Sequence, residues 1–524
     1  MQRTEELGWR QGRAPVDLVL GVDPAQPEPL HRQLYDGLRA AILEQRLRPG
    51  ARLPSTRALA STLGLARNTV HGAYDQLLAE GYLETRHGSG TFVAASLPDD
   101  AFRAGSDGVA ATMPVTGTAA ASDGSGVFRS DSAGERLSRW GRRIAEIAPV
   151  PYPGTVESLP FDFRHGRPDA THFPLEEWRR ASARQLRQLD RDDLWYGPPA
   201  GLPALRRAIA AYLGRARGVR CTPEQVIVTT GTQQAIDLVS RLLVEDGDPV
   251  VVEDPCYPGA RRVFQALGAR LLDVPVDEHG LSTDALPDGS ARLLYTTPSH
   301  QYPSGVTLPV SRRLDVLRWA ERHGALVIED DYDSEFRHVG RPLEALQGLD
   351  RSGRVAYVGS FSKVLYPALR LGYLVAPPEL IHLASEAKRL LDLQTATPGQ
   401  EMLTQLIDSG QFEAHLRRMR RVYRGRRAAL LEALAHELGD LAEPGPSEAG
   451  LYLRILLADG LDDESVARRA AGLGVAVYPA RPYFARPPAR PGLILGYAAL
   501  DEAGIGEGIR RLRQAIDMEL AITR

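Results

Sequence analysis

Residues 359–363 read Gly-Ser-Phe-Ser-Lys, and the last of them, Lys363, is one of only two lysines in a chain of 524 residues. The chain has 63 lysines and arginines in total, so arginine supplies nearly all of its positive charge. A guanidinium stays protonated and cannot condense with an aldehyde, whereas a lysine amine can. The stretch therefore predicts that Lys363 is a catalytic lysine that forms a Schiff base with an aldehyde cofactor. The alternative is a surplus surface cation.

An acidic cluster, Glu329-Asp330-Asp331-Tyr332, follows an apolar strand predicted over 325–328. Pyridoxal 5'-phosphate (PLP) is the aldehyde cofactor that lysines hold as Schiff bases, and a carboxylate keeps its ring nitrogen protonated. Asp330 suits that role, and the Tyr332 hydroxyl suits the phenolic oxygen of the ring. Tyr257 lies where an aromatic side chain could stack on the ring. A solvated acidic strand end and a simply packed tyrosine are the alternatives.

Two segments predict a phosphate site. Residues 229–233 read Thr-Thr-Gly-Thr-Gln, between a predicted strand and a predicted helix. A helix N-terminus presents free N–H groups to an anion, and glycine lets the backbone approach it closely. Side chains near Lys363 add hydroxyls and a guanidinium. The predicted phosphate ligands are Gly231, Thr232, Gln233, Ser360, Ser362 and Arg370.

The back of the chain alternates strand and helix patterns. Short apolar strands are predicted over 226–228, 249–252, 293–295, 325–328 and 355–358, and helical patterns over 234–243 and 259–267. Such alternation favours an α/β domain with a mainly parallel sheet, which binds its ligand beyond the C-terminal ends of its strands. The main candidate site residues fall at or just beyond such ends.

The front of the chain predicts a small α+β DNA-binding domain. A helical apolar stripe spans 30–43, an N-cap signal at 54–56 precedes a second helix, and a third runs over 67–80. Strands over 82–85 and 91–93 then form a glycine-rich hairpin. This order is typical of a winged helix-turn-helix that docks in the major groove, and a helical interaction domain is the alternative. The candidate DNA contacts are Arg57, Arg67, Asn68, Thr69, Arg86 and His87.

A low-complexity stretch separates the two parts. Residues 104–126 are small and polar and have no hydrophobic period. Such a segment cannot bury enough apolar surface to offset its ordering entropy. We therefore predict a DNA-binding domain over 25–94, a flexible linker over 95–152 and a cofactor domain over 153–524. A short helix is predicted within the linker, over 136–147.

Bulk composition excludes several classes of protein. The net charge is −3, so any DNA affinity must come from a local basic patch. Two cysteines give no disulfide framework. No apolar run approaches the roughly 18 residues of a membrane span, and the first residues lack the pattern of a signal peptide. We expect a soluble cytoplasmic protein.

Three stretches of the front domain resemble the GntR family of bacterial repressors. They are residues 53–60 (Leu-Pro-Ser-Thr-Arg-Ala-Leu-Ala), 67–70 (Arg-Asn-Thr-Val) and 80–83 (Glu-Gly-Tyr-Leu), and the resemblance covers about 28–93. It implies binding to a double-stranded DNA operator. One departure is Ala66, where the family often has a serine that caps the recognition helix. The missing cap is expected to cost roughly 1 kcal/mol.

The rest of the chain, from about 159 to 516, resembles the fold-type I aminotransferases, a PLP-dependent family. Residues 164–169 and 196–201 also match segments of that family. In the family, the tyrosine at the position of Tyr196 reaches the cofactor phosphate of the partner subunit, which implies a homodimer. The other matching positions are Gly231, Asp330, Tyr332, Lys363 and Arg370.

A GntR head joined to an aminotransferase-like body is the arrangement of the MocR-type transcriptional regulators. Residues 297–305 and 328–336 resemble that group specifically. Aminotransferases usually have Asn-Pro where this chain has Tyr302-Pro303, so His300 or Gln301 is the expected replacement for the asparagine contact.

A second departure lies near the C-terminus. Many aminotransferases have an arginine at the position of Ile494 that binds the substrate α-carboxylate. Isoleucine cannot do so, and without such a clamp catalysis suffers from poor orientation of the substrate. Arg481, Arg486 and Arg490, in the preceding loop, are the candidate replacements.

Three functions fit these observations. The first is a transcription factor that senses PLP, or PLP together with an amino acid or amine. The second is a working aminotransferase with an accessory DNA-binding domain. The third is a DNA-binding protein whose body serves only for dimerisation. Lys363 and its expected ring partners disfavour the third, and Ile494 disfavours the second.

Overall fold

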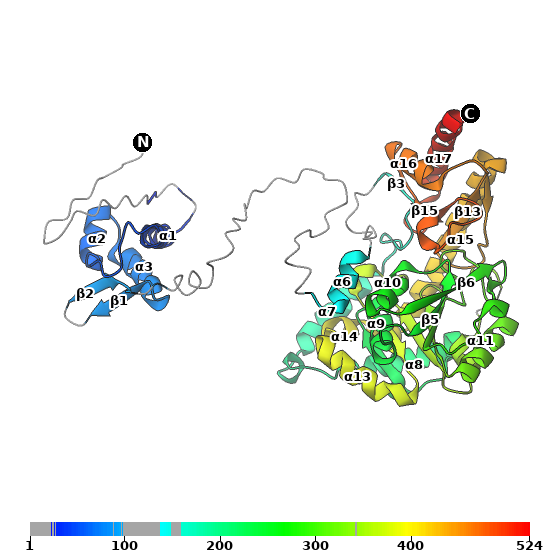
Figure 1. The fold of residues 1–524 in the computed structure, drawn as a ribbon, viewed down its shortest axis with the longest axis horizontal. Helices are drawn as coiled ribbons and strands as arrows, with labels where there is room; N and C mark the ends of the chain where they lie inside the picture. Colours follow the sequence, from blue (N-terminus) through cyan, green and yellow to red (C-terminus); the bar gives the residue numbers. More distant parts are fainter. Residues whose placement is uncertain are drawn as a thin grey trace. The chain divides into compact units, whose positions relative to one another are not determined.

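The chain divides into two compact units, Met1–Ser125 and Gly126–Arg524. The structure is a computed structural model, and it describes residues 22–23, 26, 28–86, 89–95, 97, 137–147, 159–340 and 343–523. Figure 1 draws the described part of the first unit in blue and that of the second from cyan to red. Most of the predicted linker lies outside the described residues. The boundaries of the three predicted segments remain predictions.

The first unit has three helices and a two-stranded antiparallel hairpin among its described residues. Ser55 caps α2 by accepting a hydrogen bond from the Ala58 N–H, as its position before the helix predicts. Leu34, Leu38 and Leu77 are fully or almost fully buried in a core of its own. The elements are α1 (Leu30–Leu43), α2 (Thr56–Leu63), α3 (Arg67–Ala79), β1 (Leu83–Arg86) and β2 (Gly90–Val93). They confirm the predicted winged helix-turn-helix.

The second unit is built on an eight-stranded sheet, with the order β4-β11-β10-β9-β8-β5-β6-β7. Strands β10, β9, β8, β5 and β6 run parallel, whereas β11 is antiparallel to both neighbours and β7 is antiparallel to β6. The predicted mainly parallel sheet is therefore confirmed. The strands are β4 (Val226–Thr229), β5 (Pro249–Asp254), β6 (Arg270–Asp277), β7 (Gly280–Leu281), β8 (Leu293–Thr296), β9 (Leu326–Asp331), β10 (Val355–Ser360) and β11 (Gly372–Val375).

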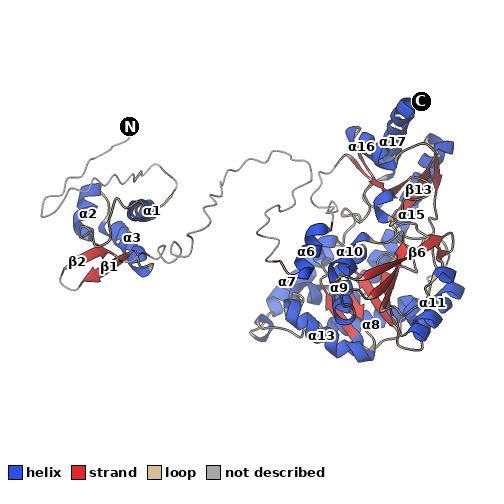
Figure 2. Ribbon diagram, viewed as in Figure 1, coloured by secondary structure: helices blue, strands red, loops and turns tan. Residues whose placement is uncertain are grey.

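Helices cover both faces of this sheet, which explains why its central strands are continuously apolar. One face packs on α9 (Thr232–Leu243), α10 (Pro258–Leu267) and α13 (Pro378–Asp392). The other packs on α11 (Val310–His323) towards β5 and β8, and on α8 (Pro203–Arg217), α14 (Thr397–Asp408) and α15 (Gln411–Glu437) towards β4 and β11. Figure 2 shows the strands in red among these blue helices.

A smaller antiparallel sheet, with the order β12-β13-β16-β15, forms the C-terminal part of the unit. One face of β13 and β16 packs on α15 and α17 through Leu453, Ile455 and Leu495. The opposite face carries Tyr452 and Ile494, which belong to a separate aromatic cluster. The elements are β12 (Ala442–Pro444), β13 (Tyr452–Leu457), α16 (Asp463–Gly472), β15 (Tyr478–Pro479), β16 (Gly492–Gly496) and α17 (Glu502–Thr523).

The remaining α-helices and strands complete the second unit. The short helix predicted over 136–147 is present as α6 (Arg139–Glu146), and Arg143 binds it to the unit by donating to the Leu267 carbonyl at 3.2 Å. The others are β3 (Phe161–Asp162), α7 (Leu175–Gln188), α12 (Leu346–Leu349) and β14 (Val475–Ala476), which pairs with β3. None of the described helices is long and apolar enough to cross a membrane.

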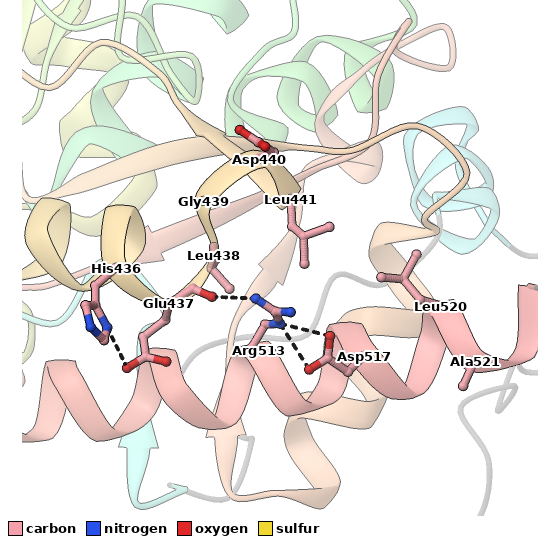
Figure 3. A pocket seen from close by; sticks show the side chains of 10 residues that line it. All are labelled: His436, Glu437, Leu438, Gly439, Asp440, Leu441, Arg513, Asp517, Leu520 and Ala521. Atoms are coloured by element: carbon pink, nitrogen blue, oxygen red, sulfur yellow. Dashed lines mark hydrogen bonds and ion pairs between the residues drawn. The ribbon is translucent and has the colours of Figure 1, made fainter.

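A cavity of about 550 Å³ opens between the end of α15 and α17 (Figure 3). Arg513 crosses it, donating to the Glu437 carbonyl at 2.8 Å and to the Asp517 carboxylate at 2.8 and 3.0 Å. The guanidinium is therefore already satisfied by protein groups. No residue of the predicted cofactor site lines this cavity.

Candidate functional site

Lys363 lies three residues beyond the end of β10, in the turn that the sequence singled out. Its Nζ donates to the Gly166 carbonyl at 3.3 Å. Enclosure of the amine by protein lowers the pKa of Lys363, and the carboxylates of Asp333 and Asp330 oppose that shift. A Cβ at Gly166, whose φ is +98°, would lie 3.1 Å from Nζ. The amine is thus closely packed and more readily deprotonated than a surface lysine.

Asp330 is buried near the end of β9, where Tyr295 donates to its Oδ2 at 2.7 Å. Its Oδ1 is also buried but has no hydrogen-bond partner within the described residues. Burial raises the pKa of Asp330 to about 7. A buried carboxylate oxygen without a donor is rare in folded proteins. Oδ1 is therefore suited to receive an N–H⁺ donor from a ligand.

The turn from β4 into α9 forms a close cradle. Gly231 precedes α9 with a φ of +111°, and a Cβ there would lie 3.0 Å from Nη2 of Arg370. Arg370 donates to the Thr230 carbonyl and itself has a left-handed φ of +53°. A Cβ at Gly372 would lie 2.8 Å from the Gly231 Cα. The structure thus brings Arg370 onto the N-terminus of α9, where Thr232 and Gln233 begin the helix.

The two predicted serines, Ser360 and Ser362, directly precede Lys363 in the sequence. Ser360 is buried at the end of β10, and its Oγ accepts a hydrogen bond from the Ser362 N–H at 3.1 Å. This bond shapes the turn that presents Lys363. Whether these hydroxyls contact a phosphate remains a prediction.

A polar network beneath the cradle was not predicted from the sequence. Gln234 accepts from the Thr230 N–H at 2.9 Å and donates to Asp392 at 2.7 Å. Lys388, the other lysine, is fully buried and donates to both Asp392 carboxylate oxygens at 2.8 Å. The network fixes the Thr230 peptide and occupies the Lys388 amine. The rarity of lysine was the only signal that could have pointed to it.

Aromatic side chains gather beside Lys363. His165, which sequence reasoning missed, hydrogen-bonds through Nε2 to the Tyr302 hydroxyl, and its ring lies 5.4 Å from that of Tyr452. Enclosure by protein, and secondly the charge of Lys363, lowers the pKa of His165 to about 3, so the ring is neutral. The Tyr257 ring lies edge-on to that of Tyr302 at 5.5 Å.

His300 and Tyr332 contact each other. The Tyr332 hydroxyl donates to the His300 carbonyl at 2.9 Å and lies 2.8 Å from the Tyr452 hydroxyl. His300 Nδ1 lies 3.0 Å from both carboxylate oxygens of Asp333, while its Nε2 is buried without a partner within the described residues. Tyr196 is not gathered with this group, because its side chain is 78% exposed on the surface.

The predicted DNA contacts of the first unit are mostly exposed. Arg57 on α2, and Arg67 and Asn68 at the start of α3, are exposed, and Thr69 is half-buried. Arg86 ends β1, where it pairs with Glu84 at 2.7 Å and stacks 4.7 Å above the Phe92 ring. His87 lies outside the described residues. Ala66 provides no side-chain cap to α3, as predicted.

Comparisons with known proteins cover both units. The family of gntR bacterial regulatory proteins matches residues 30–93, and the aminotransferase class I and II family matches 162–512. The chain is 41% identical to the probable rhizopine catabolism regulatory protein MocR of Rhizobium meliloti, over 95% of this chain and 96% of that protein. It is 32% identical to the pyridoxine biosynthesis transcriptional regulator PdxR of Corynebacterium glutamicum, over 96% of this chain and 99% of that protein.

Among solved structures, the chain is similar to LysN, the α-aminoadipate aminotransferase of Thermus thermophilus, complexed with N-(5'-phosphopyridoxyl)-L-leucine. The TM-score is 0.69 at 36% identity, over 74% of this chain and 99% of that chain. The aminotransferase class I and II family is PLP-dependent. With a DNA-binding GntR domain ahead of an aminotransferase domain, the protein belongs to the MocR-type group of GntR-family transcriptional regulators.

Proposed function

We propose that the chain is a transcriptional regulator that binds PLP at Lys363 and changes its affinity for operator DNA in response. The observation that carries this proposal is the pairing, in one site, of an enclosed amine with the buried, unpartnered Oδ1 of Asp330. Asp330 also contributes to the electrostatic environment of Lys363. PLP has a group for each of them, an aldehyde for the amine and a ring nitrogen for the carboxylate.

The residues present fit PLP. Asp330 would receive the protonated pyridine nitrogen, and Lys363 would hold the aldehyde carbon covalently. Arg370 and the N-terminus of α9 would hold the phosphate, since Gly231 and Gly372 leave no side chain in the cradle. Tyr257 remains the proposed stacking residue. When bound, PLP supplies an electron sink for an attached amine.

Operator binding is proposed to use α3 and the hairpin. Arg67 and Asn68 would reach base edges from the first turn of α3, and Arg86 would contact the phosphate backbone from the wing. The pairing of Arg86 with Glu84 leaves its charge partly compensated.

A homodimer of the second unit is part of the proposal. Exposed apolar residues cluster at the end of α7, in the loop that follows it, and at the end of α13. A Cβ at Gly197 would lie 3.0 Å from Gln394 Oε1, so the segments around 196 and 394 adjoin. A second copy of this chain is the proposed occupant, because the matching family places the tyrosine at 196 in the partner's site. The residues, 42–79% exposed, are Leu186, Leu189, Leu194, Trp195, Tyr196, Leu390, Leu391 and Leu393.

An aminotransferase activity is the second candidate, and the similarity to LysN favours it. Against it, Ile494 is fully buried and apolar at the position of the usual carboxylate-binding arginine. Arg490 pairs with Glu443 at 2.7 Å, and Arg481 lies 4.0 Å from Asp462. We therefore expect slow or absent half-transamination with α-amino acids. Single-turnover spectra test this expectation. If bound PLP is converted to the pyridoxamine form at ordinary aminotransferase rates, aminotransferase activity becomes the better-supported function.

Footprinting tests the regulator directly. The full chain, with and without PLP, is bound to duplex DNA from upstream of its own gene and of the adjacent genes. We expect a protected site whose occupancy changes with PLP. A lack of any protected site in both conditions would overturn the proposed function.

A further inference from the structure

Arg454 lies directly opposite Ile494 in the small C-terminal sheet. The register of β13 and β16 pairs Arg454 with Ile494 and Tyr452 with Gly496. Directly opposed residues of an antiparallel pair project to the same face. Tyr452 and Arg454, two residues apart on β13, also share a face. Arg454 therefore lies on the face that carries Tyr452 and Ile494, opposite to the leucine-rich face that packs on α15 and α17.

That face lines the aromatic cluster beside Lys363. Ile494 packs with Tyr302, Tyr452 and Ala480, and Phe484 lies against the same group. The Arg454 guanidinium stacks above the Phe484 ring at 5.1 Å. His165, whose pKa is influenced by the Lys363 charge, contacts the rings of Tyr302 and Tyr452. The Lys363 amine donates to the carbonyl of Gly166, the residue after His165, and the ring contacts of His165 lead through this cluster towards Arg454.

The side chain of Arg454 is half-buried. Its Nε is buried and has no hydrogen-bond partner within the described part of the chain. By contrast, the buried Arg313 donates to three backbone carbonyls at 2.7–2.9 Å. Arg426 also has a buried Nε without a partner among the described residues, but its terminal nitrogens bind the Ala498 carbonyl and the Asp169 carboxylate. Buried donors that serve only structure are normally paired. Glycine at 492 leaves room for the Arg454 side chain, since a Cβ at that position would lie 3.2 Å from Arg454 Nε.

No protein carboxylate lies within ion-pair distance of Arg454 among the described residues. The carboxylate that most affects its pKa is that of Asp463. Asp463 is buried and accepts hydrogen bonds from the N–H groups of Ala480, Arg481 and Gly492 at 3.1–3.4 Å. Its charge is thus already stabilised by the backbone. Arg490 adds a second positive charge nearby. Glu443 pairs with Arg490 at 2.7 Å, so these two arginines and two carboxylates balance in charge, and the Arg454 guanidinium is left without an ion-pair partner among the described residues.

We propose that Arg454 binds the acidic group of an amino acid effector, in place of the arginine absent at 494. The inference rests on the proposed function, because it assumes that an amino compound enters the PLP site. The amine of the effector would lie on the Lys363 side of the aromatic cluster, and its carboxylate at Arg454. A carboxylate-binding arginine at 454 would select amino acids over simple amines.

Direct binding to the PLP-loaded full chain tests this assignment. The probes are the ω-amino acids from glycine to 6-aminohexanoate together with leucine. Each is compared with the amine that results when hydrogen replaces its carboxylate. Calorimetry gives the two dissociation constants, and PLP absorption confirms that every variant is loaded. We expect at least one amino acid to bind about tenfold or more tightly than its amine, the scale of a charge-assisted hydrogen bond.

Arg454→Met should reduce this preference to about twofold or less and leave amine affinity unchanged, because only the carboxylate loses its partner. Arg454→Lys should keep part of it, since the charge remains without the planar fork. Arg468→Met is the matched control, because that arginine is exposed on the adjoining helix α16 and is not a candidate ligand of the carboxylate. Arg454→Gln gives the comparison if the methionine variant does not fold.

Two results would overturn the assignment: an undiminished preference in Arg454→Met, or wild-type protein that prefers no amino acid of the series. These results are distinct from failure of the proposed function. If the wild-type chain does not load PLP at Lys363, the regulator proposal fails first. If PLP loads and changes operator affinity but carboxylates are not preferred, only the role of Arg454 is lost.

Discussion

Lys363 and Lys388 have different surroundings, although they are the only lysines in the chain. The Lys363 amine has one long hydrogen bond to a carbonyl, whereas that of Lys388 is paired with Asp392. Lys363→Ala should abolish the visible absorption of covalently bound PLP. Lys388→Met should retain that absorption with weaker PLP affinity, because the Gln234 network loses a partner. A band that survives in Lys363→Ala would assign the covalent link to another amine.

Asp330 provides a pH test with a definite sign. Its carboxyl has a pKa of about 7 when folded, against an ordinary value of 3.8. Below about pH 4 it is protonated in both states. Between about pH 4 and 7 the unfolded state binds fewer protons, so the stability contributed by this group falls as pH rises and levels off above 7.

Asp330→Asn should remove that loss in protein stripped of PLP. The melting temperature of the variant minus that of wild type should therefore increase from pH 5 to pH 7 and then remain constant. The same variant should bind PLP more weakly, because the protonated ring nitrogen loses its counter-charge. Parallel melting profiles and equal PLP affinity would show that Asp330 is only a strand-end carboxylate.

Residues that act through local sequence were predictable, and residues that act through distant pairing were not. The turn at Gly231 and the acidic end of β9 are each contained in one short segment. Arg454 reaches the site only because β13 pairs with β16, some forty residues further along the chain. His165 likewise comes from a segment far from Lys363 in sequence. Without the strand register, nothing distinguishes Arg454 from the many other arginines.

At the scale of single elements, α3 and the hairpin should contribute differently to DNA binding. Arg67→Ala should reduce the discrimination between operator and random duplex, because a base contact is lost. Arg86→Ala should weaken both complexes to a similar extent and lower the salt slope by about 0.9. Fluorescence anisotropy at several salt concentrations measures both. Equal loss of operator and random affinity in Arg67→Ala would contradict the assignment of α3 as the reading helix.

Most elements of the site were predictable from hydrophobic periodicity and from the capping, glycine and proline residues at element ends. The helix over 30–43 and the strands that end at the site were found within a few residues. Strand β11 was not predicted, and its direction could not be inferred, because a short buried strand has the same apolar pattern whether it runs parallel or antiparallel. The small C-terminal sheet was also missed, because its strands pair across insertions such as α16.

At the scale of the whole molecule, the exposed apolar residues predict a dimer. Leu194→Glu should raise the dimer dissociation constant by roughly 30-fold, since an interface anchor contributes about 2 kcal/mol. Sedimentation at graded concentrations measures this. PLP affinity should fall in parallel if Tyr196 serves the partner's site. Leu314→Glu on α11, which is 42% exposed, is the control and should remain dimeric. Identical behaviour of the two variants would place the interface elsewhere.

The central claim is that PLP at Lys363 is energetically coupled to operator binding. The most direct measurement is the affinity of the full chain for its footprinted operator, with and without saturating PLP, in wild type and Lys363→Ala. Such couplings typically change an affinity by about 5- to 150-fold. We predict a change of that order in wild type and none in Lys363→Ala. Equal operator affinity with and without PLP in wild type, or the same PLP effect in the variant, would contradict the account.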